Sequence, residues 1–170
     1  MGSEMCIRDS SSCAFLAPSQ QSEPAIQLDP PDRAFQHTAA DLFAYAGSHF
    51  LVYTDHLTGW TEITSWRRDP STSDVVQAFR RWFTALGVPA LLFSDNGPQF
   101  ASSDFADFAA NWGFRLRHSS PRYPQANGLA ESAVKRMKHL VATTSADLQS
   151  EVFQKALLEY RNTPLSLIHI

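Results

Sequence analysis

Apolar residues gather in three closely spaced runs near the start of the chain, separated by short polar breaks. The runs span residues 36–45, 49–54 and 60–66 and are rich in aromatic and β-branched residues, which favour strands. The breaks, Gly47-Ser48 and Leu57-Thr58-Gly59, are short enough to be hairpin turns. This pattern predicts an antiparallel meander of three strands.

Beyond Pro70 the apolar residues recur at helical spacing, interrupted by short strand-like runs. The elements expected there are a helix that ends at Leu86 before Gly87, a strand at 90–94, a helix from a cap at Ser102 or Ser103 to Gly113, a strand at 114–117, a helix at about 129–143 and a helix at about 148–161. The order β-β-β-α-β-α-β-α-α predicts an α/β fold with one mixed sheet, because parallel neighbours need crossover helices.

The composition is that of a single globular domain. The chain has 170 residues, of which 44% are hydrophobic and 18% are charged. No apolar run approaches the roughly 18 residues that a membrane span needs, which argues against an integral membrane protein. The formal net charge of −3 argues against a surface that is basic all over, as a general nucleic-acid coat would be.

The two ends of the chain are related through their coding. Residues 5–10 can be encoded by a DNA sequence whose reverse complement encodes residues 165–170, and this DNA resembles the transposase mosaic end used as a sequencing adapter. The stretch that follows the first end is rich in Ser, Gln and Pro, as linkers are. We therefore expect adapter-derived residues at 1–12 and 165–170, a linker at 13–32 and a functional domain at 33–164.

Acidic residues stand where the predicted strands could place them at a site. Asp95 directly follows the apolar strand at 90–94, and the carboxyl ends of such strands border ligand crevices in open α/β sheets. An Asp there also initiates turns, so both interpretations stand. Asp41 lies inside the first apolar run, where a charge is costly unless it is paired, hydrogen-bonded or metal-bound. Asp55, at the end of the second strand, is a rival that periodicity does not exclude.

A further acid, Glu131, lies in the basic region of the chain. At about 100° per residue, Glu131, Lys135 and Lys138 fall close together on the predicted helix, beside an apolar stripe. A solvated surface with an i, i+4 Glu–Lys pair fits this pattern. The basic residues between positions 115 and 139 are Arg115, Arg117, Arg122, Lys135, Arg136 and Lys138.

Such a concentration of positive charge around one carboxylate also fits a surface that binds phosphates. Within it, the Tyr123 ring could stack on a base or ribose, and Gln125 and Asn127 could donate from their amides. Convergence of Asp41, Asp95 and Glu131 on one crevice would require a divalent cation to offset their repulsion. Oxygen ligands select Mg²⁺ or Mn²⁺, and two such ions about 3.5–4 Å apart would support phosphoryl transfer.

The three acids and the segments around them resemble the D,D-35-E triad of retroviral and gypsy-type LTR retrotransposon integrases. Asp41, Asp95 and Glu131 are separated by 53 and then 35 residues. The segments that carry the resemblance are Ala40-Asp41-Leu42-Phe43, Ser94-Asp95-Asn96-Gly97-Pro98-Gln99-Phe100, the segment from Ser119 to Glu131, and Tyr160-Arg161-Asn162-Thr163-Pro164.

This resemblance implies a ribonuclease-H-like fold, with a five-stranded mixed sheet and helices on both faces. It implies that Asp41, rather than Asp55, joins Asp95 and Glu131 as catalytic residues and ligands of Mg²⁺ or Mn²⁺. The implied reactions are 3′-end processing of retroelement DNA and strand transfer into target DNA. The implied partners are these DNAs and further copies of the chain, in a homodimer or higher oligomer, and the DNA substrate implies the nucleus.

By the same resemblance, Gln125 and Asn127 belong to a loop that grips DNA near the site, and Lys135 and Lys138 match positions that hold the end of the element's DNA. Cys13 matches the final ligand of a zinc domain upstream of the core. A catalytically silent, domesticated DNA-binding or oligomerisation module of the same fold is the alternative to an active enzyme.

Overall fold

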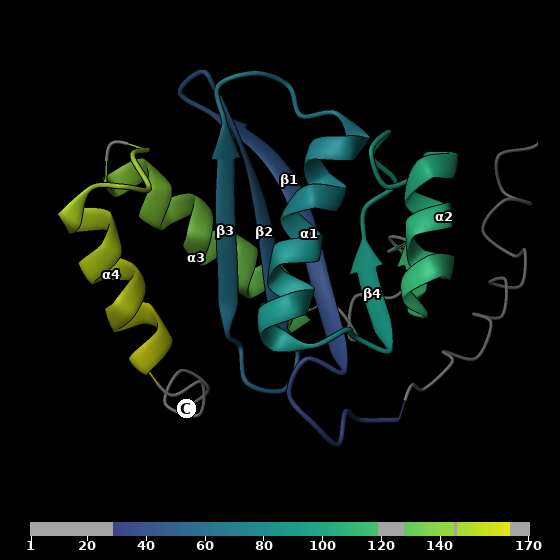
Figure 1. The fold of residues 1–170 in the computed structure, drawn as a ribbon. Helices are drawn as coiled ribbons and strands as arrows, with labels where there is room; N and C mark the ends of the chain where they lie inside the picture. The colour runs from purple at the N-terminus through teal and green to yellow at the C-terminus, as the bar shows by residue number, and fades with distance from the viewer. Residues whose placement is uncertain (1–28, 119–127, 145, 164–170) are drawn as a thin grey trace, which may run out of the picture.

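The computed structural model describes residues 29–118, 128–144 and 146–163 (Figure 1). Its elements are β1 (His37–Tyr45), β2 (Ser48–Asp55), β3 (Thr61–Trp66), α1 (Thr72–Leu86), β4 (Leu91–Ser94), α2 (Ser103–Trp112), β5 (Arg115–His118), α3 (Gly128–Thr143) and α4 (Glu151–Asn162). Of the segments expected from the sequence, the adapter-derived ends and most of the linker, with Cys13, lie outside the described residues.

The five strands form one mixed sheet in the order β3-β2-β1-β4-β5. The first three strands pair antiparallel, as the meander predicts, and β4 and β5 add to β1 in parallel. The expected α/β class and mixed sheet are therefore confirmed. The last helix begins later than the expected position of about 148, because the hydroxyl of Ser150 accepts a hydrogen bond from the Phe153 amide and caps it there.

Side chains alternate between two cores, one on each face of the sheet. On one face Leu51 and Tyr53 of β2 are fully buried in a cluster built from α1, α2 and the sheet. On the other face Phe50 and Val52 lie in a second cluster with side chains of α3 and α4. Figure 1 shows α1 in front of the sheet and α3 behind it. Helices thus cover both faces, as the resemblance implies.

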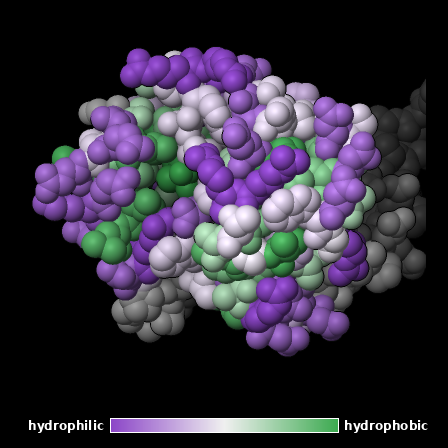
Figure 2. All heavy atoms as spheres, in the orientation of Figure 1, coloured by the Kyte–Doolittle hydropathy of each residue, from purple (hydrophilic) through white to green (hydrophobic). Residues whose placement is uncertain are grey.

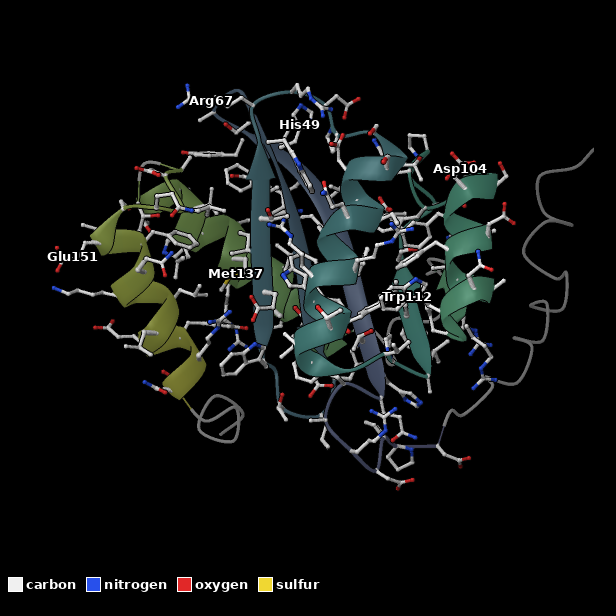
Figure 3. The ribbon with its side chains drawn as sticks, in the orientation of Figure 1. His49, Arg67, Asp104, Trp112, Met137 and Glu151 are labelled. Atoms are coloured by element: carbon white, nitrogen blue, oxygen red, sulfur yellow. The ribbon has the colours of Figure 1, made fainter. Side chains whose placement is uncertain are left out.

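The position of α3 follows from its apolar stripe. Met137 and Val141, which lie one turn apart on the helix, are fully buried against Phe50 and Val52. Figure 3 shows Met137 on the inner side of α3. This packing fixes α3 over β1 and β2, and therefore fixes which of its polar side chains reach the sheet.

A cluster around Arg161 attaches α4 to the start of β3. The Arg161 guanidinium donates to the Thr61 carbonyl from Nε and Nη2, at 3.1 and 2.8 Å. It also lies 3.0 Å from a carboxylate oxygen of Glu62 and 4.3 Å from the centroid of the Trp60 ring. The Tyr160 hydroxyl lies 3.3 Å from the Thr61 hydroxyl. The Tyr160-Arg161 part of the last motif is therefore structural.

The outward side of α4 carries apolar residues. Val152 and Leu158 are 65% and 59% exposed, and Figure 2 shows apolar surface among polar surface over this part of the molecule. Among the described residues, no helix has both the length and the apolar character needed to cross a bilayer.

Replacing Arg161 by Ala is expected to lower the free energy of unfolding by about 2–3 kcal/mol, because charge-assisted hydrogen bonds and a cation–π contact are lost together. Urea denaturation measures the change. The matched control is Lys155→Ala, which removes an exposed ion pair of 2.7 Å with Glu151 and should cost less than about 0.5 kcal/mol. Equal effects of the two substitutions would contradict the structural role of Arg161.

Candidate active site

The parallel pairing of β1 with β4 brings two of the candidate acids together. Ala40 is paired with Ser94, and Asp41 and Asp95 each follow this pair by one residue. Residues in register on neighbouring parallel strands share a face of the sheet, and the strands lie about 4.8 Å apart. Asp41 is paired across β2 with Val52, which belongs to the α3 side of the sheet. Asp41 therefore lies on the face that α3 covers, and continuation of the register places Asp95 beside it.

The ammonium group of Lys138 on α3 lies against Asp41. Its Nζ is 3.3 Å from Oδ2 of Asp41 and 5.1 Å from the centroid of the Phe43 ring. Burial raises the pKa of Asp41 above its ordinary value, the Lys138 ammonium opposes this rise, and the negative charge of Asp95 adds to it. The two acids are therefore close enough to repel, and one cationic side chain partly compensates them.

Glu131 lies on the same side of α3 as Lys138. The two positions are seven residues apart, which is 20° short of two full turns. Side chains of a helix lean toward its N-terminus, so Lys138 reaches Asp41 from a position further along α3. Residue 131 is therefore on the helix face that borders the two acids, and its side chain lies outside the described residues.

The loop after β4 holds the Asp95 carboxylate in a tight turn. Oδ1 of Asp95 accepts a hydrogen bond of 3.1 Å from the Gly97 amide. A Cβ atom at Gly97 would lie 3.0 Å from the same oxygen, so a larger residue would press on the carboxylate. Asp95 and Gly97 of the motif are thus explained by the close approach of the chain to its own acid.

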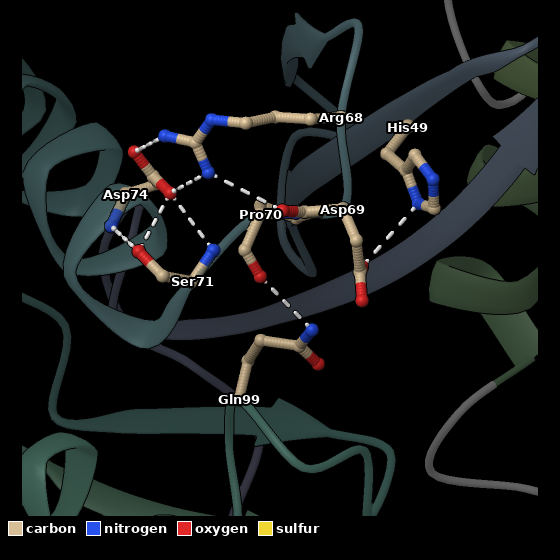
Figure 4. A network of polar contacts seen from close by, with 7 residues as sticks. All are labelled: His49, Arg68, Asp69, Pro70, Ser71, Asp74 and Gln99. Atoms are coloured by element: carbon tan, nitrogen blue, oxygen red, sulfur yellow. Dashed lines mark hydrogen bonds and ion pairs between the residues drawn. The ribbon is translucent and has the colours of Figure 1, made fainter.

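A second anchor ties this loop to the segment between β3 and α1 (Figure 4). Nε2 of Gln99 donates to the Pro70 carbonyl at 3.1 Å. That segment is itself fixed, because Arg68 donates to both carboxylate oxygens of Asp74, at 2.7 and 2.8 Å, and Asp74 and Ser71 form the capping box of α1. The hydrogen bond from Arg68 lowers the pKa of Asp74.

The two anchored segments border a cleft of about 270 Å³ next to Asp95. Leu42 and Phe43 of β1 line one side, and Asp69 and Pro98 belong to the connecting segments. His49, near the start of β2 (Figure 3), lies 3.6 Å from a carboxylate oxygen of Asp69. The cleft therefore opens beside the acid at the end of β4 and offers space next to the candidate site.

Asp55, the rival of Asp41, has a different environment. It is fully buried, and its two oxygens accept from the Phe35 amide at 2.9 Å and from the Thr58 amide and hydroxyl at 3.0 and 2.7 Å. Two of these donors belong to Thr58 in the turn after β2, and the third belongs to the segment that precedes β1. Asp55 therefore stabilises the turn that follows β2, and the structure does not bring it to Asp95.

The other predicted site residues fall into two groups. Lys135 is exposed on α3 and lines a shallow groove with Arg136, His139 and Tyr160. Tyr123, Gln125 and Asn127 lie outside the described residues. Among the side chains that are described, no three His, Cys, Asp or Glu residues form a group that could hold a metal, and the third candidate ligand is Glu131.

Sequence reasoning missed two residues that hold the site. Gln99 belongs to one of the motif segments but has no predicted role, and His118 is not among the predicted site residues. In the structure Nδ1 of His118 is 3.0 Å from the Asp95 carbonyl oxygen. Its position at the end of the predicted fifth strand, next to the strand that precedes Asp95, was the available signal.

Residues 31–124, more than half of the chain, match the family model described as integrase core domain. The chain belongs to the integrase core domain family. The matched range includes Asp41 and Asp95, and Glu131 lies beyond it. Membership agrees with the resemblance drawn from the four motif segments.

Relatives and solved structures agree with this membership. The chain is 38% identical to the Pro-Pol polyprotein of Simian foamy virus type 3 (strain LK3) over 93 residues, which is 55% of the chain and 8% of that protein. The catalytic core domain of BIV integrase is 20% identical with a TM-score of 0.62, over 74% of this chain and 82% of that one. A dimeric HTLV-2 integrase catalytic core in complex with magnesium is 21% identical with a TM-score of 0.53, over 79% and 80%.

These solved structures establish the fold as that of integrase catalytic cores, which confirms the expected ribonuclease-H-like class. The chain spans a tenth or less of the length of the first curated relatives that it matches.

The described part of the site fits a divalent cation. Asp41 and Asp95 supply carboxylate oxygens, which are the donors that Mg²⁺ and Mn²⁺ prefer. Burial and mutual repulsion raise the pKa of Asp41 even with a cationic side chain beside it. Additional positive charge between the two acids would therefore be favourable.

Asp41→Asn is expected to raise the thermal midpoint Tm at pH 7 relative to the unaltered chain. Because the pKa of Asp41 is raised above 3.8 in the folded state, the unaltered chain loses stability as pH rises from about 3.8 through the raised pKa. An Asn carries no such loss, so the advantage of the variant should disappear near pH 3. Thermal melts at both pH values measure it.

Asp55→Asn is the matched comparison and should lower the free energy of unfolding by about 2 kcal/mol at pH 7. Both carboxylate oxygens accept hydrogen bonds, whereas an amide offers one acceptor and leaves a buried N–H donor unsatisfied. If instead Asp41→Asn destabilises the chain and Asp55→Asn does not, the assignment of the two acids is reversed.

Proposed function

We propose that residues 33–164 form the catalytic core of a DNA integrase, a metal-dependent polynucleotidyl transferase. Its reactions would be removal of a terminal dinucleotide from the 3′ end of retroelement DNA and joining of that end to target DNA. The observation that carries this proposal is the pairing of β1 with β4, which sets Asp41 beside Asp95 on the face that α3 covers. Membership of the integrase core domain family supports the reaction class.

Asp41, Asp95 and Glu131 would hold the metal, as Mg²⁺ or Mn²⁺. When bound, such ions activate the attacking water or 3′-hydroxyl and stabilise the leaving oxygen. The HTLV-2 integrase core is described as a complex with magnesium, which supports the choice of ion. The chain's own contribution is to hold Asp41 on β1 and Asp95 directly after β4 at neighbouring positions of one sheet, so that little rearrangement is needed at the site.

Lys138 would neutralise charge at the site and contact DNA. Its Nζ already lies 3.3 Å from Asp41 and remains about half exposed, so one ammonium can face both the acid and a phosphate. Lys135, exposed three residues earlier on α3, would bind the DNA backbone further out. Gln125, Asn127 and Tyr123 would complete the DNA contacts from the segment that precedes α3.

The proposed partners are retroelement DNA, target DNA and further copies of the chain. The HTLV-2 core is described as dimeric, and the exposed Val152 and Leu158 of α4 offer apolar surface for an oligomer contact. We place the reaction in the nucleus, where target DNA is found, and an upstream zinc domain, with Cys13 as its last ligand, in the parent protein.

Asp95→Asn is expected to abolish strand-transfer reversal on a branched DNA substrate with Mn²⁺, because it removes a charged ligand. A gel assay of the released strand measures the reaction, and the loss should exceed about 100-fold. The matched control is Asp107→Asn, an exposed acid on α2, which should keep activity within about twofold. Equal activity of Asp95→Asn and the unaltered chain would remove the catalytic assignment, and DNA binding without any reaction by the unaltered chain would favour the silent module.

Lys138→Met is expected to weaken DNA binding and to reduce its dependence on salt. Loss of one phosphate contact should lower the slope of log affinity against log salt by about 0.9. Fluorescence anisotropy with a labelled duplex, repeated at several salt concentrations, measures both. Lys155→Met on α4 is the control, because Lys155 lies on the exposed outer side of that helix. An unchanged slope for Lys138→Met would argue against a DNA contact.

A further inference from the structure

We propose that His118 is a positioning residue for Asp95: it holds the main chain at this acid through a hydrogen bond from Nδ1 to the Asp95 carbonyl. The proposal concerns the site described above and rests on the proposed function for its catalytic consequence. No contact between the His118 ring and a reacting group is required, because the effect passes through the backbone of Asp95.

The position of His118 is set by the sheet. His118 is the last residue of β5 and is paired with Ser94, the last residue of β4. Its Nδ1 lies 3.0 Å from the Asp95 carbonyl oxygen and 3.4 Å from the Ser94 hydroxyl oxygen. The His118 ring therefore lies where the pairing between β4 and β5 ends.

The chemistry of this contact fixes the protonation of one ring nitrogen. A carbonyl oxygen only accepts, so Nδ1 of His118 must carry the hydrogen. The same carbonyl accepts a second hydrogen bond, of 3.0 Å, from the Ser94 hydroxyl. Two donors from neighbouring strands thus hold one carbonyl, and in the neutral ring Nε2 is left without a proton.

This carbonyl belongs to the main chain of the acid itself. Asp95 itself is exposed and lies just beyond the paired part of β4, and its carboxylate takes a hydrogen bond from the Gly97 amide. Rotation of the main chain at Asp95 would move the carboxylate relative to Asp41 on β1. Metal ligands must lie within about 0.2 Å of their preferred distances from the ion. A carbonyl that is fixed at Asp95 therefore favours cation binding.

Three substitutions of His118 separate this role from a general effect on stability. Asn places its amide N–H near the position of Nδ1, Gln places its N–H near that of Nε2, and Ala has neither. The Mn²⁺ affinity of the full chain without DNA is measured by electron paramagnetic resonance of free Mn²⁺. His118→Ala and His118→Gln should weaken it about 10-fold, as supporting residues of metal sites do, and His118→Asn should stay within about twofold.

The protonation of the ring gives a second readout that does not depend on activity. Long-range ¹H–¹⁵N spectra of the unaltered chain should show a hydrogen on Nδ1 and none on Nε2. A hydrogen on Nε2, or a His118→Asn variant as weak as His118→Ala, would overturn the proposal. If the unaltered chain fails to process DNA while the spectra and the order of Mn²⁺ affinities hold, the proposed function fails and the role of His118 stands.

Discussion

The parallel pairing of β1 with β4 is the constraint on which the site depends. Asp41 and Asp95 are far apart in sequence, and only the register that pairs Ala40 with Ser94 makes them neighbours. Parallel strands require a crossover connection. Here α1, which packs on the aromatic core, is part of the connection that brings β4 alongside β1. The apolar packing under α1 therefore helps to fix the neighbouring positions of Asp41 and Asp95.

The half-buried position of Asp41 beside Asp95 disfavours the charged form of Asp41, and the chain offsets this cost locally. Burial raises the pKa of Asp41, and Lys138 opposes the rise. Lys138 is available because Met137 and Val141 anchor α3 on the sheet. The same helix face carries Glu131, so one packing contact governs both the compensating charge and the third acid. Such local destabilisation is common at functional sites.

Most of the fold could be predicted from the spacing of apolar residues, because burial dictates that spacing in strands and helices alike. Where the sequence offered competing signals, prediction was less precise: apolar residues from Leu148 suggested an early start for α4, whereas the Ser150 cap decides it. Contacts of the site, such as Gln99 with Pro70 or His118 with Asp95, depend on which strands are neighbours. Local patterns carry no information on that arrangement.

The different roles of Asp41 and Asp55 follow from strand alternation. Asp55 is paired with Thr38, three residues before Asp41 on β1, and an odd separation puts the two acids on opposite faces of the sheet. One face is closed by α1 and α2, where an acid needs main-chain donors, as Asp55 has. The other is bordered by α3, which supplies a cation. A shift of one residue in the register between β1 and β2 would put both acids on the same face, so the pairing of these strands determines which acid is available for chemistry.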